Sequence, residues 1–515
     1  MSEDIIETDY EIGQDNVELF GLDMHNPVFV ISGLSIVAFV LVTLIFQESA
    51  GAAFTALRPW LTNTFDWLFM GAANIFVLFC LALIVLPVGK VRIGGKNAEP
   101  EYSYPGWFAM LFAAGMGIGL MFFGVLEPMY HTLTPPLGVD PNDIEAARAI
   151  GMAATIFHWG LHPWAIYAVV ALSLAFFCYN AGLPLTIRSA FYPLLGERVW
   201  GWSGHIIDIL AVFATLFGLA TSLGFGAEQA TAGLNYLFDI PGGTTTKVVL
   251  IIGITGIALI SVLAGLDAGV KRLSELNMLL ALLLLGFVVA VGPTTAIISG
   301  FFSGLGNYLG ELPALSNWVG REDIDFMHGW TTFYWAWWIA WSPFVGMFIA
   351  RVSKGRTVRE FIICVLIIPT LACVAWMAVF GGTAVEEYVA TGYQGVAETV
   401  KNWTPELSLF RMLEALPLTG ITSFIGIVLV IVFFVTSSDS GSLVIDTITA
   451  GGKIDAPVAQ RVFWCTFEGL VAITLLLGGG LGALQALAIA TGFPFAIVLL
   501  GMCVALYMGL RKAER

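Results

Sequence analysis

Charged residues are scarce in this chain of 515 residues: 11% are Asp, Glu, Lys or Arg, whereas 58% are hydrophobic. Soluble domains carry about a quarter charged residues, so this composition excludes an ordinary soluble domain and indicates a protein of the lipid bilayer. Runs of about 20 apolar residues, the length that crosses the hydrocarbon core, recur along the chain. We predict twelve spans, at residues 27–46, 67–88, 105–126, 147–178, 204–237, 247–266, 276–300, 328–350, 360–384, 419–447, 460–478 and 483–508.

Cysteine is rare as well, and all six cysteines fall within predicted spans. They show no paired spacing of the kind found in disulfide frameworks or zinc sites. We therefore interpret them as small apolar packing residues: Cys80, Cys178, Cys364, Cys373, Cys465 and Cys503.

The first 26 residues contain no Lys or Arg but several acids, among them Glu3, Asp4 and Asp23. A secretory signal peptide needs a basic start before its apolar core, so this segment is not one. Its charge and polarity predict a disordered, solvated tail. Loops on the cytoplasmic side of a membrane are enriched in Lys and Arg. Placing both termini in the cytoplasm puts most of the 22 basic residues there, which fits an even number of spans.

Three alternating glycines, Gly115, Gly117 and Gly119, interrupt one predicted span in the stretch AAGMGIGLMFFGVLEP. The first and third match the Gly-x-x-x-Gly pattern of close helix packing, but Gly117 lies on another face. Glycine leaves helical geometry at little cost, and a broken membrane helix persists only where it lines a cavity. We therefore predict a helix break that faces a solute, since such breaks in transporters present carbonyls to ions and amide dipoles to anionic groups.

A cluster of tryptophans lies at the centre of another predicted span. Tryptophan usually gathers at the two bilayer surfaces, and Trp337, Trp338 and Trp341 lie too deep for that. A methylated onium cation has no N–H to donate, so ring faces attract it instead, by about 0.5–2 kcal/mol per ring. No carboxylate stands at the centre of this span or of the glycine-rich segment 113–126. The pattern predicts an aromatic cage for such a cation.

The stretch FHWGLHPWAIYA adds a second aromatic set, Trp159, Trp164 and Tyr167. His158 and His162 stand four apart, as in His-Glu-x-x-His zinc sites, but Trp159 occupies the place of the glutamate and no third ligand is apparent. We expect structural hydrogen bonds from these histidines rather than a metal.

The stretches GMGIGLMFFGVLEP, FHWGLHPWAIYA and FYWAWWIAWSPFVGMFIARVSKGR closely resemble those of the betaine/choline/carnitine transporters, and the resemblance covers roughly residues 25–508. It implies an all-α integral membrane protein of twelve helices, with LeuT-type inverted five-helix repeats (helices 3–7 and 8–12) after two peripheral helices, and assembly as a homotrimer. The implied parts are an acidic cytoplasmic tail (1–26), the peripheral helices (27–100), the first repeat (101–300), a periplasmic connecting segment (301–327), the second repeat (328–508) and a short cytoplasmic tail (509–515).

The same resemblance implies roles for individual residues. Phe333 and Phe348 match aromatics that flank the pathway and would act as gates. The backbone of the broken helix would face the carboxylate end of the substrate. The implied substrate-binding residues are Ala114, Met116, Gly117, Gly119, Trp159, Trp164, Tyr167, Trp337, Trp338 and Trp341.

The stretch FFVTSSDSGS offers hydroxyls that suit a small hard cation. Thr436 and Ser437 could instead bond only to the preceding helical turn, but the resemblance favours sodium, held together with carbonyls of Ala113, Met116 and Phe433. Asp439 in the same stretch is an acid within a span and functional by default, with no role that we can assign.

A second sodium site of the family would use Thr215 and Phe344 here. Leu219 occupies the place of its second threonine, which leaves the sodium stoichiometry open. Osmosensing members also carry a long basic C-terminal helix, whereas this sequence stops at GLRKAER, so we do not expect strong C-terminal osmotic gating.

Gly119 bears on the substrate, because proton-coupled choline carriers of the family have Asp at this position. Glycine fits a zwitterion that brings its own carboxylate, and glycine betaine and dimethylsulfoniopropionate both qualify. We expect sodium symport of one of them through a bacterial inner membrane by alternating access; the alternative is a proton-coupled choline or carnitine-type transporter. No cofactor is expected besides sodium as coupling ion, the partners being substrate, sodium and lipid, with no nucleic acid.

Two other classes of protein are disfavoured. An intramembrane enzyme would need a metal triad or a nucleophile–base pair, and no spacing in the sequence supplies one. A sensor would need a cytoplasmic output domain, which neither the 26-residue tail nor the seven residues at the other end supplies.

Overall fold

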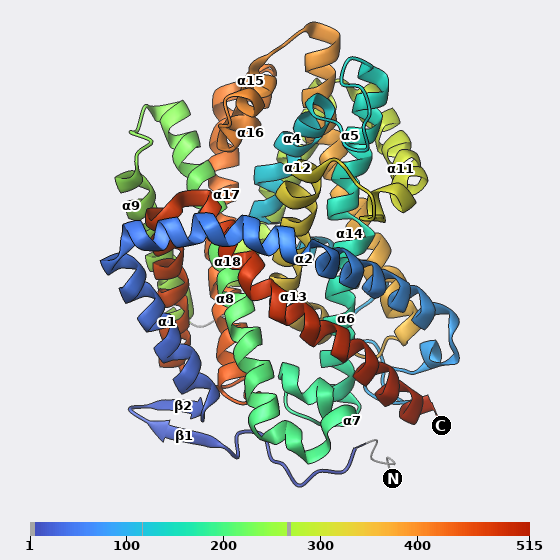
Figure 1. The fold of residues 1–515 in the computed structure, drawn as a ribbon, viewed down its shortest axis with the longest axis vertical. Coiled ribbons are helices and arrows are strands. Elements are labelled where there is room, and N and C mark those ends of the chain that lie inside the picture. The colour runs from blue at the N-terminus through green and yellow to red at the C-terminus, as the bar shows by residue number, and fades with distance from the viewer. Residues whose placement is uncertain (1–5, 116, 265–268, 515) are drawn as a thin grey trace.

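The computed structural model describes residues 6–115, 117–264 and 269–514, and this part of the chain is almost entirely helical (Figure 1). The N-terminal elements are a hairpin, β1 (Asn16–Leu19) and β2 (Leu22–His25), then α1 (Val28–Ile45), α2 (Gln47–Val85) and η1 (Pro87–Lys90). The middle contains α3 (Tyr104–Gly115), α4 (Ile118–Leu133), α5 (Ile144–Trp159), α6 (Leu161–Tyr179), η2 (Ile187–Phe191), α7 (Tyr192–Leu195), η3 (Gly196–Trp200), α8 (Trp202–Phe238), α9 (Thr244–Ala264), α10 (Gly269–Val291) and α11 (Thr294–Ser316).

The remaining elements belong to the second half. They are α12 (Ile324–Phe326), η4 (Met327–Thr331), α13 (Thr332–Val352), α14 (Val358–Glu386), η5 (Glu387–Thr391), α15 (Gly395–Lys401), η6 (Pro405–Leu407), α16 (Ser408–Glu414), α17 (Thr419–Thr449) and α18 (Val458–Glu514).

Nine helical stretches of the described residues are long and apolar enough to cross a membrane, or ten if α3 and α4 form one bent span. The chain is thus a multi-pass membrane protein. The predicted spans 460–478 and 483–508 both lie in α18, whose backbone leaves helical geometry at Gly479 and Gly480. Gly480 has a φ of +61°, a left-handed conformation that glycine adopts readily. The count of twelve spans remains a prediction.

Two boundaries near the middle of the chain are wrong. The predicted span 276–300 is two helices, because Pro293 separates α10 from α11. Proline lacks an N–H and disfavours helical geometry in the residue before it, which ends α10. α11 continues to Ser316, so the first half of the predicted connecting segment 301–327 is helical.

The predicted helix break at the glycines is confirmed. α3 ends at Gly115, α4 begins at Ile118, and the two axes differ by 69°. Gly117 lies between them in extended geometry, with φ and ψ both −174°. Met116 lies outside the described residues.

The acidic N-terminal segment is not disordered where the structure describes it, so that prediction is wrong. β1 and β2 pair in an antiparallel hairpin, and the Asp23 carboxylate lies 2.5 Å from the Lys453 ammonium. The Asn16 side-chain amide donates to the carbonyl of Ala450 at 2.9 Å. These contacts dock the hairpin on the loop between α17 and α18. A polar composition signals disorder only when no distant partner satisfies it.

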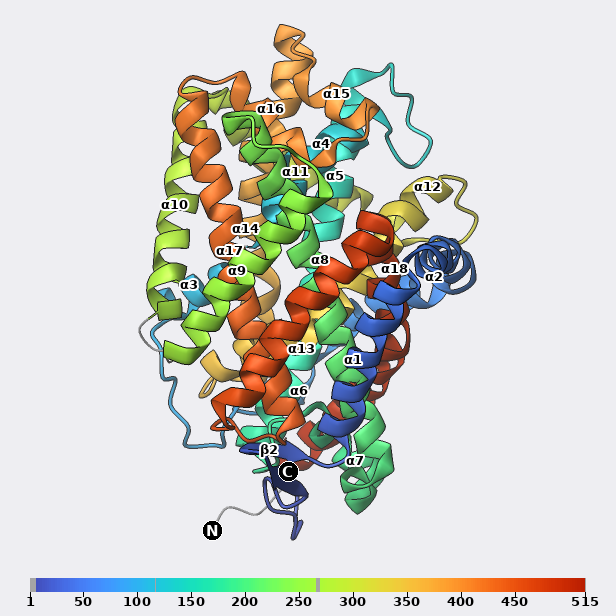
Figure 2. The ribbon, with the colours of Figure 1, turned by 90° about the vertical axis from the view of Figure 1, so that its left-hand side faces the viewer.

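The long helices run side by side, and α2 lies across them (Figure 1), so that it is seen nearly end-on in Figure 2. α13 packs against α6, α8 and α18, whereas α4 packs against α5 and α14. Both ends of the described part of the chain lie toward the end of the molecule that carries the hairpin (Figure 2). α5 ends at Trp159 and α6 begins at Leu161, with Gly160 between them. Side chains near the end of α5 and near the start of α6 can therefore reach the same region of the molecule.

Candidate functional site

A small cavity lies where the broken helix meets α13. Tryptophan rings make up much of its wall, and the ends of α3 and α4 contribute backbone. Its lining residues are Ala114, Gly117, Ile118, Gly119, Leu120, Trp159, Trp164, Tyr167, Ser222, Trp337, Trp338, Trp341 and Cys373.

The structure brings together every described residue that the sequence assigns to the substrate. Nine of the ten line this one cavity, although they come from α3, α4, α5, α6 and α13 and the residue before α4; the tenth, Met116, lies outside the described residues. The sequence misses Ile118, Leu120, Ser222 and Cys373. Ser222 and Cys373 carry no motif of their own, and only the packing of α8 and α14 brings them to the cavity.

The indole N–H groups fix the orientation of the rings. Trp338 donates to the carbonyl of His158 at 2.9 Å, and Trp341 donates to the carbonyl of Gly218 at 2.8 Å. Trp164 and Trp337 donate to the Trp159 carbonyl and the Ser222 hydroxyl, each at 3.2 Å. Because a buried indole has a single donor, these bonds tie each ring to a neighbouring segment.

Gly119 lies between two of the rings. A Cβ at this position would stand 2.8 Å from Cη2 of Trp159 and 3.0 Å from Cη2 of Trp337. Any side chain here would displace the aromatic wall, so steric space alone requires glycine. Gly117 differs, because a Cβ there would meet no described atom within 4 Å.

The two predicted gate residues have different environments. Phe333 is buried and stacks on Trp337, with ring centroids 5.5 Å apart and an interplanar angle of 15°. Phe348 on α13 is 37% exposed. Phe333 therefore continues the aromatic wall, and Phe348 stands away from it.

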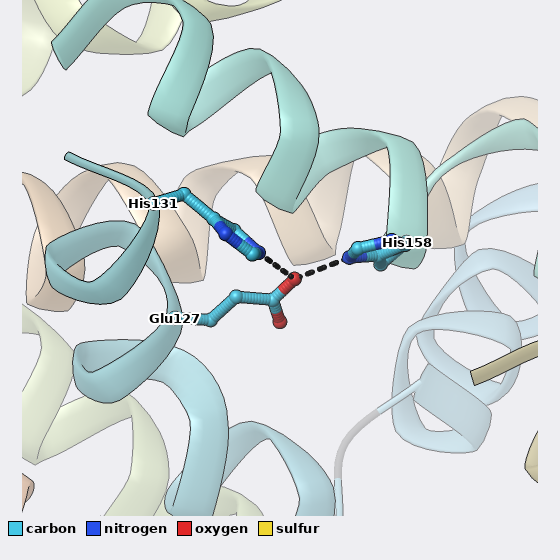
Figure 3. Close-up of side chains that lie close together, drawn as sticks. All are labelled: Glu127, His131 and His158. Atoms are coloured by element: carbon cyan, nitrogen blue, oxygen red, sulfur yellow. Dashed lines mark hydrogen bonds and ion pairs between the residues drawn. The ribbon is translucent and has the colours of Figure 1, made fainter. Parts of the chain in front are cut away.

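A buried carboxylate, Glu127, lies between His131 and His158 (Figure 3) and is bonded to Trp159 of the cavity wall. Its Oε1 accepts from Nδ1 of His158 at 2.5 Å and faces Nε2 of His131 at 3.3 Å. Its Oε2 accepts from the indole N–H of Trp159 at 2.8 Å and from the hydroxyl of Tyr334 at 2.5 Å. Four donors surround the carboxylate, an arrangement suited to its ionised form.

Sequence reasoning missed Glu127 by one residue, because it examined the glycine-rich segment only as far as position 126. The signal was present: an acid within an apolar segment, with His131 four residues later on the same helix face. The two histidines that sequence spacing paired do not converge, since Nε2 of His162 bonds to Oδ1 of Asn74 on α2. His158 turns toward Glu127 instead. Donor atoms of Glu127, His131 and His158 lie within 4.8 Å of one another, which is compatible in reach with a metal.

The predicted sodium ligands lie mostly on α17. The Thr436 hydroxyl donates to the carbonyls of Val432 at 3.0 Å and Phe433 at 3.3 Å, so its present bonds are to the preceding turn. Thr436 and Ser437 are nevertheless partly exposed between buried neighbours. Their oxygens and the Phe433 carbonyl have the hardness that sodium requires. Ala113 is not on α17; it lies near the end of α3, just before the break between α3 and α4.

The second ion site has less support. Thr215 is buried and donates to the carbonyl of Ala211 at 2.7 Å. Leu219 packs closely on Gly441 of α17, where the family's second threonine would stand. Phe344 makes an edge contact with Trp341, centroids 5.2 Å apart. Leu219 and Phe344 thus make apolar contacts, and the Thr215 hydroxyl already has a hydrogen-bond acceptor.

Asp439, to which the sequence assigns no role, is buried on α17 and accepts from the Ser261 hydroxyl of α9 at 2.9 Å. It lines no part of the aromatic cavity. Its described hydrogen bond ties α17 to α9.

Comparison with known proteins finds a family model and several similar chains. The family model for betaine/carnitine/choline family transporters matches residues 27–515. A glycine betaine/proline/choline transporter of Vibrio parahaemolyticus is 62% identical over 99% of this chain and 95% of its own length. Glycine betaine transporter 1 of the same organism is 56% identical, over 99% and 98%. The solved manganese transporter of Eremococcus coleocola, in complex with an aromatic bis-isothiourea substituted compound, superposes with a TM-score of 0.42 at 11% identity, over 81% of this chain and 87% of that one.

Proposed function

Since this chain belongs to the betaine/carnitine/choline family of transporters, we propose that it imports a zwitterionic methylated onium solute by sodium symport. Glycine betaine and dimethylsulfoniopropionate are the two solutes of this class that we favour. The chain is a transporter and not an enzyme. We therefore propose which solute the cavity binds and which ion gradient drives its transport.

One observation carries the proposal: indole and phenol rings from three helices surround a single cavity. A trimethylammonium or dimethylsulfonium head has no N–H, so it gains little from hydrogen-bond acceptors and much from ring faces. The head would contact rings of α13, Trp337, Trp338 and Trp341, and rings of α5 and α6, Trp159 and Tyr167. Polar solutes that need several hydrogen bonds would find few partners in this wall.

The carboxylate end of the solute has a complementary site in the broken helix. α4 begins at Ile118, and the backbone from Gly117 to Leu120 lines the cavity. The first N–H groups of a helix have no partner within it and carry a partial positive charge. An anionic group placed there is stabilised. A zwitterion of this length would thus meet rings at one end and amide dipoles at the other.

Sodium would couple to this arrangement through α17. Thr436, Ser437 and the Phe433 carbonyl would bind the ion together with backbone of the broken helix, at Ala113 and Met116. Ion binding would order the break and so favour solute binding. One charge moving across 100 mV contributes about 2.3 kcal/mol to the driving force.

The remaining architecture is proposed on the family resemblance. We propose twelve spans with inverted repeats of helices 3–7 and 8–12, a homotrimer in the bacterial inner membrane, and both termini in the cytoplasm. The common location of the two termini (Figure 2) supports the last point. Rocking of the repeats about the cavity would expose it alternately to the two sides.

Uptake into proteoliposomes tests the function. Labelled glycine betaine and labelled dimethylsulfoniopropionate are offered under an inward sodium gradient, and separately under an inward proton gradient without sodium. Sodium-driven accumulation of either solute supports the proposal. Accumulation that requires protons and not sodium would contradict it.

A second candidate function is broader transport that includes choline and proline, because the 62% identical relative is named for both. Choline has the same onium head but no carboxylate, so it would lack the contact with the α4 terminus. Choline and proline are therefore included as competitors in the uptake assay. Strong competition by choline would show that the ring contacts dominate recognition.

A further inference from the structure

Trp159 differs from the other indoles of the cavity. The N–H groups of Trp164, Trp338 and Trp341 end on backbone carbonyls, and that of Trp337 ends on a hydroxyl. Among the described lining residues, Trp159 alone donates to a carboxylate, Glu127. Hydrogen bonds to an ionised acceptor are roughly twice as strong as neutral ones.

Such a bond changes the ring as well as its position. An anionic acceptor at the N–H draws the proton and shifts electron density into the indole, because hydrogen bonds polarise the groups that they join, and more so in a medium of low dielectric. The attraction between a cation and an aromatic face grows with the negative charge of that face. The bond to Glu127 therefore strengthens the face that Trp159 presents to the cavity.

The side chains around Glu127 fix the orientation of its carboxylate. Its Oε1 is oriented by His158, whose other nitrogen lies 2.9 Å from the Thr331 hydroxyl, and faced by His131 (Figure 3). Tyr334 shares Oε2 with Trp159 and stacks on His158, ring centroids 4.7 Å apart. The carboxylate is thus fixed from α4, α5, η4 and α13 and cannot turn away from the indole without losing several bonds.

We propose that Glu127 is a positioning residue that sets the preference of the cavity for a cationic head by orienting and polarising Trp159. The inference rests on the proposed function, since it concerns the same cavity. Replacing Glu127 should therefore weaken the binding of a charged head more than the binding of an uncharged head of equal shape. The loss of a purely structural role would weaken both equally.

The experiment compares two ligands of nearly equal shape. Glycine betaine carries a trimethylammonium head, and 3,3-dimethylbutanoate carries a tert-butyl head on the same acetate. Binding of labelled glycine betaine, and its displacement by 3,3-dimethylbutanoate, are measured on purified full-length protein in EDTA. The readout is the ratio of the two affinities.

The wild type should prefer glycine betaine. E127Q keeps the shape of the side chain and removes its charge, and we expect it to reduce the preference about threefold to tenfold, mainly through weaker binding of glycine betaine. W159F removes the N–H and should reduce the preference by itself. Adding E127Q to W159F should then change the ratio no further. Glu387→Gln is the control for the substitution itself, because it replaces a buried glutamate of η5 that does not line the cavity.

Several results would overturn the inference. E127Q could weaken both ligands equally, which would mean a packing role. Its effect could persist in the W159F background, which would mean that the charge acts directly on the solute. Wild-type binding could be lost in EDTA, which would assign Glu127, His131 and His158 to a metal. If E127Q does not fold, W159F decides, since an unchanged ratio there contradicts the inference. Failure of the wild type to bind glycine betaine would instead contradict the proposed function.

Discussion

The aromatic cavity and the predicted sodium site are built in different ways. The indoles of the cavity are anchored by hydrogen bonds to other segments, as Trp338 is to the His158 carbonyl on α5. Thr436 of the predicted ion site bonds within its own helix, to carbonyls of the preceding turn. Side chains at helical spacing assemble a cavity as soon as their helices pack. An ion site made of carbonyls from two segments depends in addition on the conformation of the break between α3 and α4.

The removal of one ring from the aromatic cavity should have the largest effect on binding. Trp338→Ala should weaken glycine betaine binding about 30-fold, because the cation–π contribution of one desolvated ring, about 2 kcal/mol, corresponds to that factor. Binding of labelled glycine betaine to the purified protein measures the loss. The variant should elute like the wild type in size-exclusion chromatography, and unchanged affinity would show that the cage is wrongly assigned.

A single methyl group should act on the same cavity less strongly. Gly119→Ala places a Cβ 2.8–3.0 Å from two rings, so the rings must shift, and we expect about tenfold weaker binding. Gly117→Ala is the matched control, because its Cβ would meet no described atom within 4 Å and its extended backbone suits any residue. Equal effects of the two variants would contradict the steric explanation.

The ion site should respond separately from the cavity. Thr436→Val removes one hydroxyl while keeping the shape of the side chain, and we expect the sodium concentration for half-maximal uptake to rise about fivefold to tenfold. One hydrogen-bonding ligand contributes about 1–1.5 kcal/mol, which corresponds to such a factor. The affinity for glycine betaine at saturating sodium should stay within about twofold. A change in solute affinity with no change in sodium dependence would place Thr436 outside the ion site.

The smallest effect concerns the docked hairpin, far from both sites. Burial, and then the nearby Arg188, lower the pKa of His25 from 6.5 to about 3, so His25 is neutral in the docked hairpin at pH 7. The free segment takes up a proton more readily. The contribution of His25 to the stability of the docked hairpin is therefore fully present above pH 6.5, and it is lost as the pH falls toward 3. Amide exchange of residues 16–25, corrected for its intrinsic pH dependence, should accelerate severalfold between pH 7.5 and pH 5.5, and His25→Gln should remove most of this dependence.

The sequence predicts the cavity well because its residues carry their own signal. Trp337, Trp338 and Trp341 are unusual at the centre of a span, and the three alternating glycines predict the helix break. Every described residue assigned to the substrate lines one cavity, although its role in binding remains a proposal.

What the sequence could not supply depends on contacts between distant segments. The docked hairpin rests on the ion pair of Asp23 with Lys453, which no local composition reveals. Ser222 and Cys373 reach the cavity only through helix packing. The end of α11 was missed because the stretch after Gly300 mixes polar and apolar residues, which a search for continuous apolar runs passes over.

The burial of Glu127 has a consequence for biogenesis. An ionised side chain in a membrane-spanning helix makes insertion by the translocon less favourable, so α4 is a poor candidate to enter the bilayer alone. Two of its donors, His158 and Trp159, arrive with α5, which follows directly in the chain, whereas Tyr334 is synthesised much later. α4 and α5 therefore insert best as a helical hairpin that already shields the carboxylate, before the rest of the cavity wall exists.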